Sequence, residues 1–276
     1  MSPYQKMIRV LVAAVLWSAA LTMIVPFLWM LSASLSDAGD LFSDRILLFP
    51  WPIRWRNYID LFGEIPFGQM LWNSVFVSVS ATFGTLFSCS LAGFAFARLE
   101  FPGRGILFAI VLSTLMIPAF VTVVPVFLLF RWLGWVNTHL PLIVPAFFGQ
   151  AFGIFLLRQF FMTFPKDLDD AARIDGCGIA RLFLSIALPL AVPALVTLAL
   201  LAFMGHWNNL LSPLIYLVTV DKLTVPAGLA YFQDAYVSNW NLFLAGALIS
   251  VVPTLTLFFA AQDVFVRGIV TTGMKQ

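Results

Sequence analysis

Charged residues are absent from six long stretches of the sequence, and each stretch is long enough to cross a membrane as a helix. The shortest, 106–130, gives about 37 Å of helix at about 1.5 Å per residue, against a hydrocarbon core of about 30 Å. The fifth stretch, 182–220, is longer, but prolines near its start and its far end reduce it to one span. The pattern predicts six transmembrane helices, near residues 10–34, 70–97, 106–130, 138–161, 190–207 and 242–264.

The composition excludes most other classes of protein. Hydrophobic residues make up 61% and charged residues 10% of the 276 residues, and the mean hydropathy is +0.97, whereas soluble domains carry about 25% charged residues. The same numbers exclude a disordered chain, and a net charge of +2 is too small for a nucleic-acid partner. Cys89 lies in an apolar span and Cys177 in a polar loop, so no disulfide is expected. We expect an all-α membrane protein in a lipid bilayer, with residues 1–276 forming one transmembrane domain.

The positive charges predict the orientation of the chain. Lys6 and Arg9 precede the first apolar stretch, which is too long for the apolar region of a signal peptide and is expected to remain as an anchor. With the N-terminus in the cytosol, the inner segments hold ten Lys and Arg residues and the outer segments hold five. Because positively charged loops favour the cytosol, we expect both termini and the loop at 163–189 on the cytoplasmic side.

Groups that would make the chain an enzyme or an ion-coupled carrier are missing from the sequence. No predicted span has Asp, Glu, Lys or Arg in its middle, where such carriers often place ionisable groups. His139 and His206 have no Cys or carboxylate spaced to complete a metal site. None of the four lysines follows a glycine, as the phosphate-binding P-loop requires. The chain is expected to be no enzyme and to hold no cofactor, so if ATP drives it, a partner binds the ATP and Mg.

The loop at 163–189 has the residue order of two short helices joined by a turn. Pro165 suits the first turn of a helix, and the aspartates that follow it complement the helix dipole. Gly176 is typical of a helix C-terminus. A second helix is expected over about 179–188. The prediction is a cytoplasmic helix–turn–helix.

The first helix of this loop has an unusual surface for a solvated segment. Asp169 and Arg173 form an i, i+4 pair, which leaves Asp170 without a local partner. Small or apolar residues and one carboxylate share one side of the helix: Leu168, Ala171, Ala172 and Asp175. A knob of small residues beside a free carboxylate is suited to docking in a groove of another protein. The alternative is that this helix only caps its own bundle.

These residues resemble a known family. Asp170-Ala171-Ala172, three residues, Gly176, nine residues and Ile186-Ala187-Leu188-Pro189 match the spacing of the cytoplasmic EAA loop of bacterial ABC-importer permeases. The family has Glu where this chain has Asp170, one methylene shorter. Further segments resemble carbohydrate-uptake permeases, in particular the shorter six-span subunit of maltose-type and glycerol-phosphate-type importers: Asn57-Tyr58, the segment 98–104, Trp207-Asn208 and the tail 266–275.

The resemblance implies a permease subunit of an ATP-driven, binding-protein-dependent importer for a sugar or sugar derivative, in a bacterial or archaeal inner membrane. It implies three kinds of partner: a dimer of ABC ATPase subunits, a second permease subunit that is a different chain, and an extracytoplasmic substrate-binding protein. The residues implied in coupling to the ATPase are Asp170, Ala171, Ala172, Gly176, Leu188 and Pro189. The tail residues implied in a further ATPase contact are Gly273, Met274, Lys275 and Gln276.

Polar residues near the spans are candidates for lining a pathway, because sugar hydroxyls need hydrogen-bond partners in an apolar channel. The candidates are Asn73, Ser74, Ser78, Trp207 and Asn208. The structural alternative is that Ser and Thr hold helices together and that Trp belongs to an interfacial belt. Glycerol-3-phosphate or a phosphodiester is an alternative substrate, and an ion-coupled carrier is an alternative class.

Overall fold

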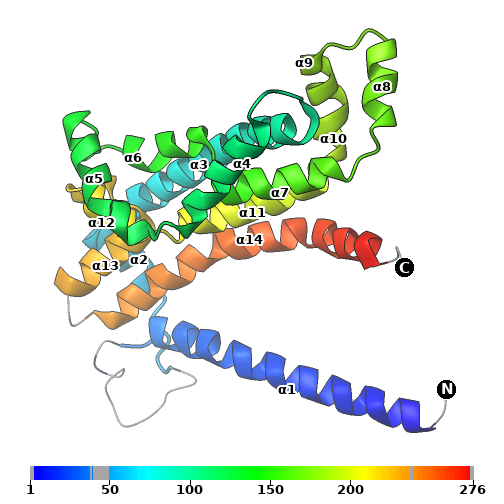
Figure 1. Ribbon diagram of the computed structural model, residues 1–276. Helices are drawn as coiled ribbons and strands as arrows, with labels where there is room; N and C mark the ends of the chain where they lie inside the picture. Colours follow the sequence, from blue (N-terminus) through cyan, green and yellow to red (C-terminus); the bar gives the residue numbers. More distant parts are fainter. Residues whose placement is uncertain (1–2, 38, 40–49, 236–238, 274–276) are drawn as a thin grey trace. The chain divides into compact units, whose positions relative to one another are not determined.

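The computed structural model describes residues 3–273 except 38, 40–49 and 236–238. All regular secondary structure in these residues is helical (Figure 1). The α-helices are α1 Pro3–Ser34, α2 Arg56–Glu64, α3 Phe67–Arg98, α4 Arg104–Ser113, α5 Ala119–Trp132, α6 Leu140–Ile143, α7 Ala151–Met162, α8 Asp167–Ile174, α9 Ile179–Leu182, α10 Leu188–Leu190, α11 Val192–Trp207, α12 Leu211–Tyr216, α13 Val225–Ala235 and α14 Trp240–Gly273. Short 3-10 turns lie at Thr114–Met116, Val144–Phe148 and Val220–Lys222, and a π-helical turn lies at Phe183–Ala187.

Four helical segments among the described residues are long and apolar enough to cross a membrane: Tyr4–Ser34, Phe67–Arg98, Leu140–Met162 and Trp240–Gln262. They coincide with the first, second, fourth and sixth predicted spans. Two further pairs of helices pass the same test only together, because each pair is sharply bent. The all-α membrane class is therefore confirmed, whereas the number of spans is four, or six if each bent pair counts as one.

The third predicted span is not one straight helix. Arg104–Met116 and Ala119–Trp132 meet at 101°. The cause is Pro118, which has no N–H to donate and keeps the preceding residue out of the helical region. Ile117 accordingly has φ −82° and ψ 116°. The fifth predicted span is likewise preceded by Ile179–Leu190, which meets Val192–Trp207 at 77°.

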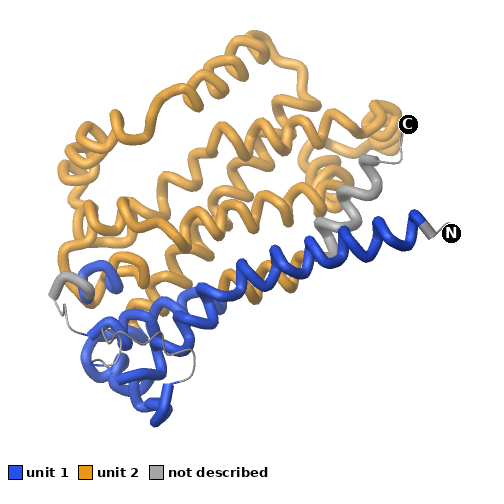
Figure 2. Tube along the Cα trace, turned by 90° about the horizontal axis from the view of Figure 1, so that it is seen from below, with its two compact units in different colours: residues 1–68, 228–252 blue, residues 69–227, 253–276 orange. Residues whose placement is uncertain are grey.

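The chain forms two compact units, 1–68 with 228–252 and 69–227 with 253–276 (Figure 2). In the first unit, α2 is fixed to the end of α1 by side chains. The Asn57 amide donates to the carbonyl oxygens of Ser34 (2.8 Å) and Ser36 (2.9 Å), and the Tyr58 hydroxyl lies 2.8 Å from Ser34 Oγ. The side chains of Leu61 and Phe67 are fully buried in the same unit.

The core of the second unit joins α3, α7 and α11 to the 163–189 segment. Its buried residues include Cys89 and Phe94 of α3, Leu157 and Phe161 of α7, and Ala172 of α8. The Phe94 ring lies 5.8 Å from that of Phe161 and 5.1 Å from that of Phe183. The 163–189 segment is therefore packed onto the ends of these helices through its own apolar residues.

Glycine allows α3 and α7 to approach closely. A Cβ on Gly93 would lie 3.0 Å from Leu157 Cβ and 3.1 Å from the Arg158 backbone nitrogen, and a Cβ on Gly153 would lie 2.7 Å from Cys89 Sγ. Small residues are the usual means by which membrane helices pack with their backbones close together. The 163–189 segment is therefore packed against two helices, α3 and α7, whose backbones lie close together.

Candidate functional site

The helix α8 begins at Asp167 and ends in a turn that its sequence specifies. Gly176 has φ +76°, in the left-handed region where glycine has no Cβ penalty. The N–H of Cys177 donates to the Ala172 carbonyl (2.9 Å), and the N–H of Gly176 donates to the Arg173 carbonyl (3.0 Å). This pair of bonds is a Schellman motif. Gly176 therefore ends the helix as predicted, and Pro165 lies in the link before the helix.

Two opposite sides of α8 have different surroundings. Ala172 is buried in the core of the second unit, and Asp169 is half-buried on the same inward-facing side. Four residues at i, i+3, i+4 and i+7 share the exposed side: Asp167, Asp170, Ala171 and Ile174. Of the predicted set, Ala172 alone faces inward, since Leu168, Ala171 and Asp175 are exposed. Ile174 adds a large apolar side chain to the surface that a partner can reach.

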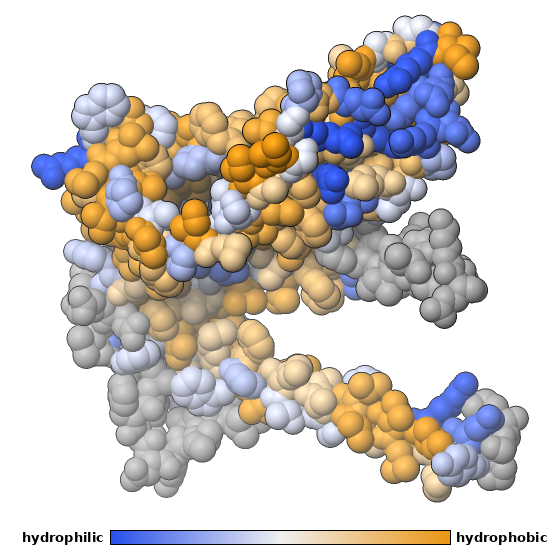
Figure 3. Space-filling model, in the orientation of Figure 1, coloured by the Kyte–Doolittle hydropathy of each residue, from blue (hydrophilic) through white to orange (hydrophobic). Residues whose placement is uncertain are grey.

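Ile174 is the residue of α8 that sequence reasoning missed. Its side chain is 86% exposed, although an isoleucine at the end of a short helix would ordinarily be expected to face the core. Hydrophilic residues gather over the end of the second unit that carries α8, among hydrophobic ones (Figure 3). An exposed carboxylate at Asp170 beside an exposed apolar side chain has the composition of a docking surface.

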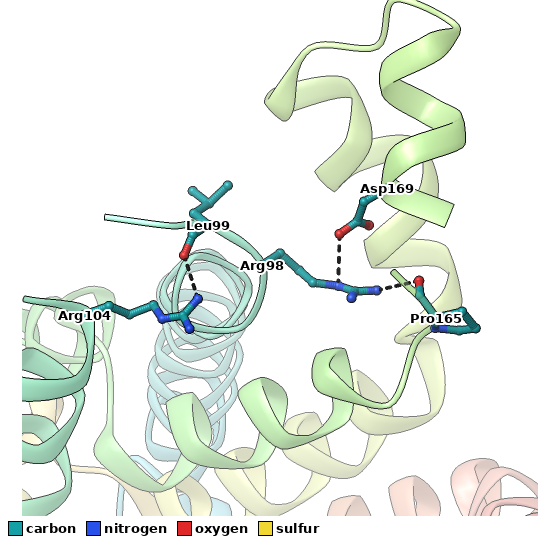
Figure 4. A network of polar contacts seen from close by, with 5 residues as sticks. All are labelled: Arg98, Leu99, Arg104, Pro165 and Asp169. Atoms are coloured by element: carbon teal, nitrogen blue, oxygen red, sulfur yellow. Dashed lines mark hydrogen bonds and ion pairs between the residues drawn. The ribbon is translucent and has the colours of Figure 1, made fainter. Parts of the chain in front are cut away.

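Asp169 does not pair with Arg173. Its Oδ2 lies 3.5 Å from Nε of Arg98, the last residue of α3, and both side chains are largely buried, with exposed fractions of 15% and 7%. Figure 4 shows this pair. Arg173 is solvent-exposed, so the partner that removes Asp169 from water is the distant arginine. Asp170 forms no ion pair with any described residue, in agreement with the prediction that it is free.

Of the other residues predicted for coupling, one lies in α8 and two lie in α10. Ala171 is exposed on α8, Leu188 is half-buried and Pro189 is exposed in α10. Leu188 packs at the margin of the core of the second unit. Of the predicted tail contact, Gly273 ends α14, while Met274, Lys275 and Gln276 lie outside the described residues.

Two of the three predicted pathway residues of α3, Asn73 and Ser74, have hydrogen-bond partners within the chain. The Asn73 amide donates to the carbonyl oxygens of Asp221 (2.8 Å) and Leu223 (3.0 Å), and Ser74 Oγ accepts a bond from the Val225 N–H (2.7 Å). These bonds fix the 221–225 segment to the N-terminal part of α3. Ser78 is fully buried, and its Oγ has no hydrogen-bond partner among the described residues.

Trp207 and Asn208 lie together at the end of α11. The Trp207 side chain is buried and stacks on Phe203 with the ring centroids 5.6 Å apart. The Asn208 amide donates to the Met204 carbonyl (2.9 Å) and remains exposed. The two candidates thus differ in whether a solute could reach them in this conformation.

The chain matches a known family and several known proteins. The family described as "Binding-protein-dependent transport system inner membrane component" matches residues 84–271. The arabinooligosaccharides transport system permease protein AraQ of Halalkalibacterium halodurans is 36% identical over 258 residues, which cover 91% of each chain. The trehalose/maltose transport system permease protein MalG of Thermococcus litoralis is 30% identical over 274 residues, covering 98% of this chain and 97% of the relative.

A similar fold is found among solved structures. A crystal structure of a bacterial ABC transporter involved in the import of the acidic polysaccharide alginate contains a chain with a TM-score of 0.82 and 24% sequence identity. The similarity covers 95% of this chain and 98% of that one. The whole helical arrangement, and not only the segment with α8, therefore has a counterpart.

Proposed function

Because the chain belongs to the family of binding-protein-dependent transport system inner membrane components, we propose that it is a permease subunit that imports a sugar or sugar derivative with energy from a separate ATPase. The single observation that carries the coupling part of this proposal is the build of α8. The helix is anchored by Ala172 and Asp169 on one side and exposes Asp170, Ala171 and Ile174 on the other. A partner can bind the exposed side of such a helix while the other side stays packed against the rest of the subunit.

The proposed assembly has four further parts around this subunit. A second, different permease chain completes the pathway, two ATPase subunits bind Mg and ATP, and an extracytoplasmic binding protein delivers the substrate. Both termini and α8 lie in the cytosol in this arrangement, supported by the excess of Lys and Arg in the inner segments. Residues 1–276 act as one transmembrane domain that alternates between outward-open and inward-open states.

The coupling residues have different tasks in this proposal. Asp170, Ala171 and Ile174 contact the ATPase, while Ala172 and Gly176 hold the helix in place and end it. Leu188 and Pro189 connect the segment to α11, whose first turn follows directly. The tail from Gly273 to Gln276 provides an additional contact to the ATPase.

A carbohydrate substrate is supported by the names of the relatives, which transport arabino-oligosaccharides and trehalose or maltose. Asn73, Ser74, Ser78, Trp207 and Asn208 remain candidates for the pathway. Those whose polar atoms are already bonded within the chain, such as Asn73 and Ser74, would have to exchange these bonds for substrate contacts. Glycerol-3-phosphate and phosphodiesters are disfavoured, because the predicted spans have no Lys or Arg in their middle to meet an anion.

The test is to purify the tagged chain gently from its native membrane, identify the chains that accompany it, and reconstitute the complex in liposomes. Uptake is then measured for neutral oligosaccharides and for glycerol-3-phosphate, with the binding protein outside and ATP inside. The proposal expects ATP-dependent uptake of a neutral oligosaccharide. Uptake of glycerol-3-phosphate alone would contradict the substrate class, and uptake by the isolated chain without ATP would contradict the importer.

A further inference from the structure

One guanidinium at the end of α3 contacts three residues of the segment that carries α8, and Figure 4 shows two of them, Pro165 and Asp169. Arg98 Nε forms the ion pair with Asp169, Nη2 donates to the Pro165 carbonyl at 3.3 Å, and the group lies 5.9 Å from the centroid of the Phe164 ring. These residues cover the link from α7 and the first turn of α8. Arg98 therefore contacts both the link that leads into α8, through Phe164 and Pro165, and the helix itself, through Asp169.

The surroundings make this ion pair different from a surface pair in the same chain. Arg56 and Asp60 of α2 lie 3.3 Å apart with exposed fractions of 84% and 44%, and such pairs contribute little because water screens them. Arg98 and Asp169 are exposed by only 7% and 15%. Separating two charges that have lost their water leaves each of them uncompensated, which is strongly unfavourable. The two side chains should therefore stay together when either helix moves.

The opposite end of α3 is also attached to the rest of the second unit. Asn73 and Ser74 hold the 221–225 segment by three hydrogen bonds. From Asn73 to Arg98 the helix extends about 37 Å at about 1.5 Å per residue, the depth of a membrane. A displacement of its Arg98 end can thus reach a segment on the far side of the bilayer without a break in the helix.

We propose that Arg98 is a positioning residue that fixes α8 to α3, so that a movement of α8 is passed to α3 and not only to the helices that are covalently joined to it. This inference rests on the proposed function, because it takes the ATPase as the source of the movement. Without Arg98, α8 keeps its link to α7 and the apolar core around Ala172, but it loses its ion pair and its hydrogen-bonded link to α3. ATP hydrolysis would then proceed with less substrate moved for each ATP.

The experiment compares Arg98→Gln, Asp169→Asn and the charge exchange Arg98→Asp with Asp169→Arg in the complete reconstituted complex. Arg104→Gln is the matched control, because Arg104 lies at the same end of the unit and donates to the Leu99 carbonyl at 3.0 Å, as Figure 4 shows. The measurements are the yield of assembled complex, ATP hydrolysis, substrate uptake and the amide exchange of α8.

The two single variants should assemble normally, hydrolyse ATP and transport about tenfold less substrate for each ATP, as expected for a change in a coupling contact. Amide exchange in α8 should rise in both, while Arg104→Gln behaves as the wild type. The charge exchange should recover most of the lost coupling, which a purely structural role in assembly would not produce.

Unchanged substrate transport per ATP in both single variants would overturn the inference. So would a loss of uptake that follows a loss of assembled complex and is not recovered by the charge exchange. A wild-type complex with no ATP-driven uptake would instead overturn the proposed function, and the coupling role of Arg98 with it. The readouts thus separate the failure of this inference from the failure of its premise.

Discussion

Asp169 and Asp170 are adjacent residues with the same side chain, and the turn of α8 gives them opposite surroundings. Asp169 is withdrawn toward Arg98 at the end of α3, whereas Asp170 is solvent-exposed. One carboxylate therefore holds the helix, and its neighbour is available to a partner. Because the two residues differ in location and not in chemistry, substitutions at the two positions should produce different defects.

Asp170→Arg should abolish ATP hydrolysis that is stimulated by the binding protein, while the complex still assembles. The exposed position makes the change tolerable for folding, but a positive charge would replace the carboxylate at the proposed ATPase contact, where like-charge or unpaired contacts are costly. Stimulated ATPase activity and uptake in liposomes measure the effect. Glu100→Arg, another exposed carboxylate outside α8, is the control, and normal stimulated activity in Asp170→Arg would refute the role of this carboxylate.

Ile174→Ala should weaken the association with the ATPase about tenfold or more, as expected when a large apolar side chain is lost from the centre of an interface. The stability of the chain itself should change by no more than about 0.5 kcal/mol, because the residue is exposed. The apparent affinity of the purified ATPase for the permease in detergent reports the first effect, and thermal unfolding reports the second. Ile59→Ala is the matched control, since Ile59 is an exposed isoleucine of α2. Equal affinities for both variants would remove Ile174 from the contact.

At the scale of the helices, the sequence predicted correctly those features that depend only on hydrogen bonds between neighbouring residues. Gly176 ends α8 because only its own backbone conformation and two neighbouring carbonyls are involved. The partner of Asp169 could not be predicted in the same way, since Arg98 is 71 residues earlier in the chain and Arg173 offered a nearer match. One signal was present: Arg98 directly follows a long uncharged stretch that ends at Ala97.

Hydropathy likewise predicted where the apolar segments lie, but not whether each of them is a straight or a bent helix. The stretch 106–130 reads as a continuous span, because a proline in an apolar segment hardly changes the mean hydropathy. The bend at Ile117 and Pro118 comes from the backbone, to which hydropathy is insensitive. Ala172 was placed on the exposed side for a related reason, since helical periodicity shows which residues share a side and not which of them faces the core.

Gly176→Ala should destabilise the end of α8, because φ +76° places an L-residue in a conformation that costs about 1–2 kcal/mol. No atom lies within 4 Å of the position of the added Cβ, so the effect is conformational and not steric. Gly178→Ala is the control, since Gly178 has φ −72° and equally open surroundings. Amide exchange at Gly176 or its replacement and at Cys177 should rise in the first variant and stay unchanged in the second. Equal exchange in the two variants would contradict the assigned turn.

Gly93→Ala should lower the thermal stability of the purified protein, and Gly205→Ala should not. Both glycines lie inside helices, but a Cβ at Gly93 would press on Leu157 and on the backbone of Arg158 in α7, while a Cβ at Gly205 meets nothing within 4 Å. In α11 the substitution can even stabilise, since alanine favours a helix over glycine by about 1 kcal/mol in water. A fluorescence-monitored melting curve in detergent compares the two, and a fall in both variants would argue against a specific contact of α3 with α7.

For the whole molecule, the placement of charge agrees with the proposed source of energy. No predicted span has Asp, Glu, Lys or Arg in its middle, where ion-coupled carriers often place such groups. On the face that Figure 3 shows, the largest group of hydrophilic residues of the second unit lies around α8. In the proposed mechanism, energy for transport comes from the ATPase and enters the molecule as a movement of this end.

Uptake by the reconstituted complex should accordingly require ATP and be indifferent to ion gradients. Liposomes loaded with Mg and ATP should accumulate substrate when the binding protein is outside, and ionophores that collapse proton and sodium gradients should leave the initial rate unchanged. Liposomes with this chain alone should take up nothing under an imposed gradient, because they lack both the second half of the pathway and the source of movement. Substrate uptake in that last sample, sensitive to an ionophore, would show that the chain has a coupling site of its own and would exclude the assignment of energy transfer to α8.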